Sequence, residues 1–238
     1  PVTDTLQALE ISKALQLDSF QLSKIPDVKL YQAVDMLGEE GISLILPVIK
    51  VTDSQDGKVT ELNGTAVFKK DKLVGYLDPD ETKFFMFLKN RINNGLFLTN
   101  LDSKDKNITL EILGSQTKIT PILSNGNVTM QINIKTKVTL AENQTNKDYL
   151  TQDGFETVEK NAEAEIRTGI LDLIAKVQKE YNSDIFGFGA AIHRDKPDWW
   201  KKNKSNWNEL FPSLKCTVSI EMEIKNAGTA QTIIKVGD

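Results

Sequence analysis

The chain has 238 residues, of which 39% are hydrophobic and 26% are charged, enough apolar material for one or two folded domains. These proportions exclude a disordered or fibrous protein. The formal net charge of −4 provides no basic field to attract nucleic acid, so we expect no nucleic-acid partner. No apolar run approaches the ~20 residues that a membrane-spanning helix needs.

Residues 1–100 predict a mixed α/β unit. Apolar residues at helical spacing indicate two helices, the second of which buries Leu30, Val34 and Leu37 and stops at Gly38. Runs rich in β-branched and aromatic residues indicate strands. In chain order the predicted elements are a helix over 3–17, a helix over 27–37, and strands over 42–51, 65–68 and 73–77.

The motif DPDE predicts the start of a third helix. Asp78 stands at the N-cap, Pro79 at the first helical position, and Glu81 where it completes a capping box. Apolar residues at helical spacing follow, and the Asn-Gly pair at 94–95 predicts the end of this helix. The motif LFLTNL, at 96–101, predicts one more strand.

A polar stretch, NLDSKDKN, is the best candidate for a domain boundary, and we place a linker over 101–107. The residues beyond it, 108–238, predict a second domain. From Val128 to Leu140 apolar and polar residues alternate, so one face of the sheet is packed and the other is wet, as in antiparallel sheets. The motif SNGN, at 124–127, predicts a hairpin turn.

A long amphipathic helix is predicted over 153–181, where apolar residues recur at steps of three and four, and a strand over 214–225 returns to the sheet. Charge pairs are expected on the solvent side of the helix: Glu156–Lys160, Glu163–Arg167 and Asp172–Lys176. The fold class is therefore α+β. We expect two mixed α/β domains, the C-terminal one a largely antiparallel sheet packed by the long helix and a short tryptophan-containing helix.

The stretch 184–207 gathers the single histidine and all three tryptophans. Its GFGAAI motif lacks the preceding strand and the small sixth residue of a dinucleotide-binding fingerprint, so we interpret it as a glycine turn after a helix. His193 has no accompanying zinc ligands and no serine in a nucleophile elbow. We interpret it as structural, with an interface role or catalysis as alternatives. The sequence predicts no catalytic residue, no metal site and no cofactor.

The tryptophans of this stretch have helical spacing. A short helix between Pro197 and Pro212 places Trp200 and Trp207 on one face, which we expect to pack on the domain while the lysines remain in water. The alternative is a basic and aromatic binding patch that includes Trp199, which lies off the packed face. The residues of this candidate interaction surface are His193, Arg194, Trp199, Lys201, Lys202 and Lys204.

Cys216 is the single cysteine, so the chain forms no internal disulfide. It alternates with apolar residues between Leu214 and Ile224, which predicts a buried and inert thiol on one face of a strand. A nucleophilic cysteine would need a nearby histidine or a helix N-terminus to stabilise its thiolate.

Two segments carry a family resemblance. The first is ELNGTAVFKKDKLVGYLDPDET, at 61–82, and the second is NSDIFGFGAAIHRDKPDWWKKNKSNWNELFPSLKCTVSIEMEI, at 182–224. They resemble a strand–turn–strand–helix signature and a D-I-F-G-F-G, I-H-R, two-tryptophan and F-P hallmark of the Ger(x)C spore germination lipoproteins, the C subunits of bacterial spore germinant receptors. The resemblance spans 40–238. Ala190 stands where the family often has a charged residue, which weakens any functional claim for that position.

The resemblance implies an exported lipoprotein on the outer face of the spore inner membrane, anchored by lipid on an N-terminal cysteine. It also implies two integral-membrane partners, the A and B subunits, in a receptor that triggers germination when nutrients appear. Family members have three mixed α/β domains. We therefore expect residues 1–100 to be the middle domain and 108–238 the C-terminal domain, with the first domain and the lipid-bearing cysteine missing from this chain.

Three functions follow as hypotheses. The first is a non-enzymatic receptor subunit that acts through contacts with the membrane subunits, since the family has no established catalytic residues. The second is direct binding of a small nutrient, which requires a mostly apolar pocket with a few fixed polar groups. The third is a hydrolase that uses His193, which requires a concave site joining this residue to carboxylates.

Overall fold

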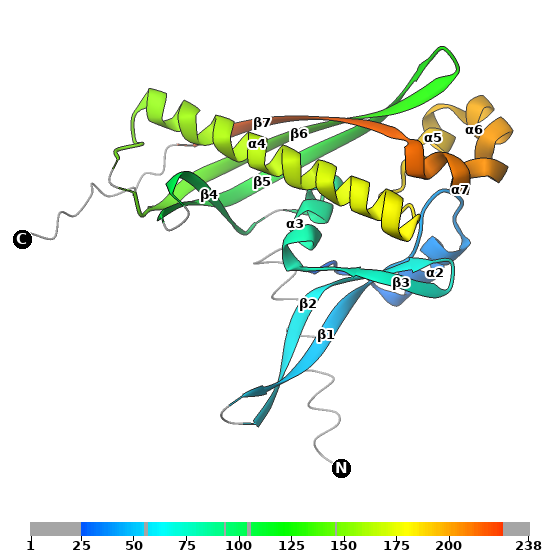
Figure 1. Ribbon diagram of the computed structural model, residues 1–238, viewed down its shortest axis with the longest axis horizontal. Coiled ribbons are helices and arrows are strands. Elements are labelled where there is room, and N and C mark those ends of the chain that lie inside the picture. The colour runs from blue at the N-terminus through cyan, green and yellow to red at the C-terminus, as the bar shows by residue number, and fades with distance from the viewer. Residues whose placement is uncertain (1–24, 55–56, 93, 104–105, 146, 226–238) are drawn as a thin grey trace, which may run out of the picture.

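The computed structural model describes residues 25–54, 57–92, 94–103, 106–145 and 147–225. The helix predicted over 3–17 lies outside these residues. The described strands form a three-stranded sheet and a four-stranded sheet, and the long helix α4 (Gln152–Lys176) runs across the larger sheet (Figure 1). The α+β fold class is therefore confirmed.

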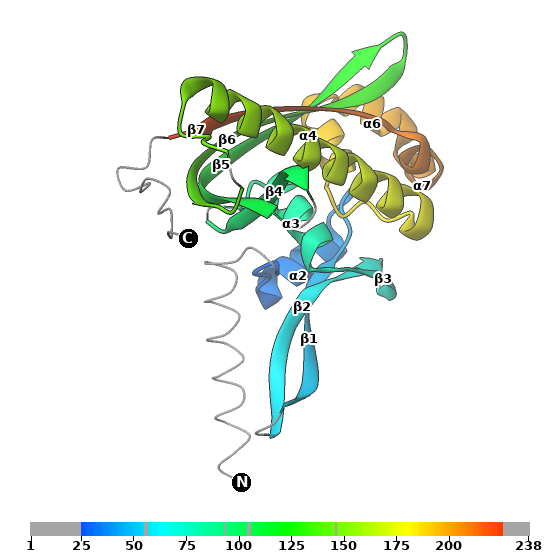
Figure 2. The ribbon, with the colours of Figure 1, turned by 60° about the vertical axis from the view of Figure 1, so that its left-hand side comes forward.

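The three-stranded sheet is antiparallel, with strand order β1-β2-β3. The predicted strands are confirmed, and β2 is longer than expected. A hairpin turn joins β2 to β3 and places Lys70 in the left-handed region, with φ of 57°. The strands β1 and β2 project away from the rest of the molecule (Figure 2). The bounds are β1 (Ile45–Ser54), β2 (Gly57–Lys69) and β3 (Lys72–Leu77).

Helix α2 (Leu30–Gly38) ends at Gly38 as predicted, but the face predicted to be buried is exposed. The exposed fractions are 83% for Leu30, 60% for Val34 and 52% for Leu37. Apolar residues occur on both sides of this short helix, so periodicity alone does not select the buried face. The buried face is determined by how the helix packs on the rest of the protein: Ala33 is buried, and the half-buried Met36 packs against the core.

Helix α3 (Pro79–Leu88) begins with the predicted capping box. Asp78 Oδ1 accepts a hydrogen bond from the Glu81 N–H at 2.8 Å, and Glu81 Oε2 accepts one from the Asp78 N–H at 2.9 Å. The predicted end at 94–95 is wrong, because the helix stops at Leu88. Asn90 takes the left-handed conformation, with φ of 55°, and this conformation does not continue an α-helix.

The four-stranded sheet has the order β4-β5-β6-β7, and β7 runs parallel to β6. Every second residue of β6 from Val128 to Leu140 is buried, so one face of the sheet is packed, as predicted. Asn125 and Gly126 take positive φ angles, 50° and 81°, in the predicted hairpin turn. The bounds are β4 (Leu96–Ser103), β5 (Lys106–Ser124), β6 (Asn127–Asn143) and β7 (Lys215–Ile224).

The stretch predicted as a linker, 101–107, lies where β4 and β5 pair. Ser103 of β4 is opposite Lys106 of β5, and the pairing continues with Thr99 opposite Ile108 after a shift in register. The strand at the end of the first predicted domain is thus part of the sheet of the second, because the backbone hydrogen bonds of β4 go to β5. The division of the chain into two domains stays a prediction.

Helix α4 continues into a π-helical turn, η1 (Val177–Tyr181). Of the predicted charge pairs, Glu156 and Lys160 lie 3.9 Å apart, whereas Lys176 pairs with Glu81 of α3 at 2.7 Å and so turns away from the predicted solvent side. The predicted apolar stripe is buried at Val158, Ala162, Ile166, Ile170, Leu173, Ile174 and Val177.

The carboxylates of α4 also cover the edges of the larger sheet. Glu163 accepts a hydrogen bond from the Met222 N–H of β7 at 2.8 Å, and Glu159 accepts one from the Ile224 N–H at 2.7 Å. On the opposite edge, Glu165 accepts one from the β4 backbone at 3.3 Å. Free edge groups would otherwise pair with another chain, so α4 protects the sheet as well as burying its face.

The single helix predicted between Pro197 and Pro212 is broken into short segments. Asn203 donates its side-chain N–H to the Trp199 carbonyl at 2.8 Å, and side-chain bonds of this kind compete with the helical ladder. Trp200 and Trp207 are nevertheless buried, as predicted. The segments are α6 (Pro197–Asn203), η2 (Lys204–Asn206), α7 (Trp207–Leu210) and η3 (Phe211–Ser213), and a separate helix, α5 (Phe188–Asp195), precedes them.

Candidate functional site

The junction between the two sheets is built from the residues that follow α4. Tyr181 donates its hydroxyl to the Tyr76 carbonyl of β3 at 2.7 Å, and Ser183 donates to the Phe68 carbonyl of β2 at 2.5 Å. These bonds attach the end of the long helix to the smaller sheet. Buried side chains of both sheets belong to one hydrophobic core, so the junction is packed.

Asp184 organises the turn that leaves this junction. Its carboxylate is buried and accepts hydrogen bonds from the backbone N–H groups of Gly187, Phe188 and Gly189, at 2.9, 3.1 and 2.8 Å. These N–H groups open α5, where a helix has unpaired donors and favours a negative charge. The aspartate of the D-I-F-G-F-G motif is therefore the anion that caps this helix.

The buried acid of this turn lies near a half-buried base, Lys89, at the end of α3. Burial raises the pKa of Asp184 to about 6, and the backbone N–H groups and Lys89 oppose this rise. Burial also lowers the pKa of Lys89, whose ammonium donates to the Phe186 carbonyl at 3.2 Å. Desolvation thus favours the neutral form of each group.

Each of the two glycines in the motif is required for a different structural reason. Gly187 has φ of 77°, a region that side chains with a Cβ rarely adopt. A Cβ on Gly189 would lie 2.6 Å from the Cα of Gly41, where Ala190 donates its N–H to the Gly41 carbonyl at 3.0 Å. The interpretation of GFGAAI as a glycine turn is confirmed, and the turn permits a close backbone contact between the two parts of the chain.

An aromatic row follows the turn. The ring of His193 stacks on Trp200 with centroids 5.9 Å apart, Trp200 meets Trp207 edge-on at 5.2 Å, and Trp207 contacts Phe211 at 5.9 Å. Such offset and edge-on contacts stabilise aromatic pairs beyond the area they bury. These ring contacts pack the short segments α6 to η3 together beside the junction.

The π-helical turn η1 positions two polar side chains that sequence reasoning missed. Buried Gln178 donates to the carbonyls of Phe211 and Leu214, both at 2.9 Å. Asn182, which follows η1, has φ of 44° and donates to the Asn208 carbonyl at 3.0 Å. π-turns are frequent at functional sites. The apolar spacing runs through η1 without interruption, so hydrophobic periodicity carries no signal of it.

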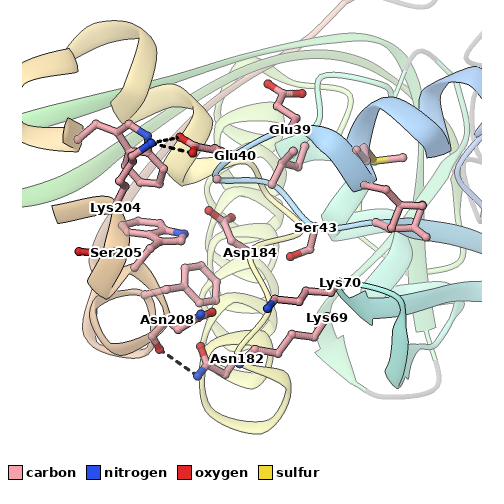
Figure 3. A pocket seen from close by; sticks show the side chains of 18 residues that line it. Glu39, Glu40, Ser43, Lys69, Lys70, Asn182, Asp184, Lys204, Ser205 and Asn208 are labelled. Carbon is pink, nitrogen blue, oxygen red and sulfur yellow. Dashed lines mark hydrogen bonds and ion pairs between the residues drawn. The ribbon is translucent and has the colours of Figure 1, made fainter. Parts of the chain in front are cut away.

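A cavity of ≈ 430 Å³, here called the junction cavity, lies between the aromatic row and the loop at 39–44. Figure 3 shows that Ser43, Lys70 and Asp184, from three separate segments, surround it. Its volume is within the range of small-molecule sites. His193, the residue of the catalytic hypothesis, is not among the residues that line this cavity.

The residues of the candidate interaction surface are brought together on α5, α6 and η2. Exposed His193 covers Trp200, and Arg194 pairs with Asp195 at 2.7 Å. Half-buried Trp199 donates its indole N–H to the Gly126 carbonyl, at the tip of the β5–β6 hairpin, at 2.9 Å. These side chains already have structural partners within the chain.

The lysines of this surface differ from one another. Lys204 pairs with Glu40 at 2.8 Å and closes the rim of the junction cavity. Lys201 and Lys202 are exposed on α6, and within the described ranges they form no hydrogen bond or ion pair. These two ammonium groups are therefore the ones available to a partner, and the surface as a whole stays a prediction.

Cys216 is half-buried on β7 and not fully buried as predicted, and burial raises the pKa of its thiol to about 12, which disfavours the reactive thiolate. In the part of the chain that the structure describes, no three His, Cys, Asp or Glu side chains are grouped to hold a metal ion. None of the described helices combines the length and the apolarity needed to cross a membrane.

Comparison with known proteins agrees with this architecture. The family model described as "Spore germination B3/ GerAC like, C-terminal" matches residues 63–228. Spore germination protein B3 of Bacillus subtilis (strain 168) is 30% identical over 80% of this chain and 50% of that protein. Spore germination protein KC of the same organism is 23% identical over 98% of this chain and 60% of that protein.

A solved structure shares the fold. The crystal structure of the GerBC protein matches with a TM-score of 0.72 and 28% identity, over 84% of this chain and 61% of that chain. The sheet crossed by α4 and the turn capped by Asp184 lie within the matched C-terminal region of spore germination proteins. The chain belongs to the spore germination B3/GerAC-like family, which confirms the resemblance, and it spans about half the length of the curated relatives it matches.

Proposed function

We propose that this chain is part of a non-enzymatic lipoprotein subunit of a nutrient germinant receptor that spores need for germination. The subunit acts through contacts with the A and B integral-membrane subunits, at the outer face of the spore inner membrane, where an N-terminal lipid anchor holds it. The observation that carries the proposal is the family match over residues 63–228, together with relatives named as spore germination proteins.

The surroundings of His193 support a subunit without catalysis. The imidazole is exposed, stacks on Trp200, and forms no hydrogen bond with any residue that the structure describes. A general base needs a partner that orients it and a reacting group within hydrogen-bond reach. We expect a His193→Ala variant to fold normally and to leave germination unchanged. A correctly folded variant that abolishes germination would support the hydrolase hypothesis instead.

The cationic surface of α6 supports contact with a partner. Lys201 and Lys202 point into solvent beside each other, and charged groups of this kind accelerate and orient association with an oppositely charged surface. Neither ammonium is needed for an internal bond within the described residues. Their charge can therefore be reversed without a loss of fold.

The test compares two charge-reversal variants of the full-length protein. Lys201→Glu with Lys202→Glu changes the α6 surface, and Lys72→Glu with Lys137→Glu makes the same charge change at exposed sites on β3 and β6. We expect the α6 variant alone to reduce co-purification with the A and B subunits several-fold and to delay germination. Equal co-purification and timing for both variants would remove α6 as the docking surface.

A further inference from the structure

We propose that the junction cavity binds a small polar molecule of no net charge that carries both an oxygen acceptor and an N–H donor. The site is formed by the aromatic row, the residues that follow η1 and the loop at 39–44. The inference goes beyond the receptor proposal and does not depend on docking to the membrane subunits. It rests on unpaired buried atoms, on the charge balance of the lining and on the fixed position of one acceptor.

Residues with unpaired buried polar atoms are grouped around this cavity. Among the described residues, Trp200 Nε1, Trp207 Nε1 and Asn182 Oδ1 are buried without a hydrogen-bond partner, and all three residues line the cavity. Trp200 is 2% exposed and Trp207 is 9% exposed, so both indoles are largely removed from bulk solvent. Buried polar groups are nearly always paired in folded proteins, so their grouping here points to a ligand.

The two indoles differ slightly in their surroundings. The Glu40 carboxylate lies close enough to the Trp200 indole N–H for this group, after Lys204, to lower its pKa, although the geometry of a hydrogen bond between them is not reached. Lys204 already binds both oxygens of Glu40, at 2.8 and 3.0 Å. Trp207 Nε1 has no hydrogen-bond partner among the described residues and is the clearer donor to a ligand.

The acceptor is held in place. Asn182 donates its own N–H to the Asn208 carbonyl, which leaves the side-chain oxygen with one orientation. Its backbone has φ of 44°, and residues in sparsely populated conformations of this kind cluster at ligand sites. Asn182 directly follows η1, so the end of the helix positions the acceptor.

The lining defines the chemical class. Indole N–H groups are donors only, so they select a carbonyl or carboxylate oxygen, while Asn182 Oδ1 selects an N–H group. Apart from the Glu40–Lys204 pair, two acidic and two basic residues line the cavity, which favours a neutral or zwitterionic molecule over an ion. These residues are Glu39, Asp184, Lys69 and Lys70.

The experiment uses the indole N–H resonances of the purified 238-residue chain, labelled with nitrogen-15. Acetamide and glycine carry both groups, acetate carries only the acceptor, and methylammonium carries only the donor. We expect acetamide or glycine to shift the Trp200 and Trp207 resonances saturably and more strongly than either single-group probe. Trp199 is the internal control, because its indole is already bound to the Gly126 carbonyl.

Three variants test the assignment. Trp207→Phe keeps a ring but removes the donor, and Asn182→Gly removes the acceptor at a backbone conformation that glycine tolerates. Each is expected to weaken binding of the better probe about tenfold, whereas Trp199→Phe leaves it unchanged.

Unshifted Trp200 and Trp207 resonances with both two-group probes would overturn the proposal, as would equal shifts by the single-group probes. Since the titration contains no membrane subunit, its failure is distinguishable from loss of receptor contact.

Discussion

At the residue scale, Asp184 links a short sequence motif to the junction of the molecule. One carboxylate satisfies three backbone donors at the start of α5, and Gly187 and Gly189 allow the turn to approach it and the facing loop. An asparagine at position 184 would have a single acceptor oxygen, and its NH₂ group would face backbone N–H groups that need an acceptor.

We therefore expect Asp184→Asn to lower the free energy of unfolding by about 3 kcal/mol, because charge-assisted hydrogen bonds are lost in a buried position. Urea denaturation followed by circular dichroism measures the change. Asp71→Asn, at an exposed turn position, is the matched control and should stay within about 0.5 kcal/mol of the wild type. A stability for Asp184→Asn equal to that of the control would contradict the capping role.

Asp184 also predicts a pH dependence. Its pKa is raised from 3.8 to about 6 in the folded chain, so between these values the folded state holds the proton more tightly than the unfolded state. The free energy of unfolding should therefore fall as the pH rises from about 4 to about 6, by roughly 1 kcal/mol per pH unit, and level off above. The difference in stability between wild type and Asp184→Asn, measured across this range, isolates the effect. A difference that rises with pH would contradict it.

At the scale of elements, α4 combines two tasks. Its apolar stripe covers the packed face of the sheet, and Glu159 and Glu163 receive the N–H groups of the edge strand β7. An uncovered edge is a template for pairing with another chain. Charged residues of this amphipathic helix thus form hydrogen bonds with the edge of the sheet, in addition to those that face solvent.

Replacing both Glu159 and Glu163 with Ala is expected to reduce the free energy of unfolding by about 2 kcal/mol and to promote association through β7. Thermal denaturation and sedimentation velocity measure the two effects. Glu156→Ala removes only a loose, exposed ion pair with Lys160 and should change neither. A double variant that remains as stable and as monodisperse as Glu156→Ala would show that the edge needs no cover.

A hydrogen bond from α6 holds the tip of the β5–β6 hairpin. Trp199 donates to the Gly126 carbonyl, and Ile122 and Leu123 nearby on β5 are each 44% exposed. Trp199→Phe should therefore let amides at the hairpin tip exchange about tenfold faster, while amides near buried Ile132 keep their rates. Hydrogen exchange by mass spectrometry distinguishes the two regions. Unchanged exchange at the tip would mean that strand pairing alone holds it.

At the scale of the whole molecule, one core joins the two sheets, and their contact is close enough to exclude a Cβ. Gly189 and Gly41 approach backbone to backbone, so Gly189→Ala must separate the two parts. We expect a loss of about 2 kcal/mol, the order found for overpacking. Gly38→Ala is the control, because a Cβ there meets nothing within 4 Å.

Tryptophan fluorescence and circular dichroism should give one coincident unfolding transition in the wild type. A Gly189→Ala variant as stable as Gly38→Ala would disprove the tight junction.

Local sequence patterns were sufficient to predict the elements that are stabilised by residues close together in the chain. The capping box at Asp78, the Asn-Gly turn at 125–126, the alternation along β6 and the stripe of α4 all follow from contacts between near neighbours in the chain. The family could also be predicted from the sequence. Its D-I-F-G-F-G motif needs an aspartate to accept the backbone N–H groups and glycines where a Cβ would not fit, so other residues rarely replace them.

What tertiary structure alone decided depends on partners distant in sequence. Three features depend on segments whose positions local patterns do not predict: the buried face of α2, the ion pair of Lys176 with Glu81, and the pairing of β4 with β5. The junction cavity is of the same kind, because its unpaired indoles and its amide acceptor come together only when the turn η1 and the aromatic row fold against the loop at 39–44. Periodicity reports which residues prefer burial, whereas the packing of distant segments determines what each buried group meets.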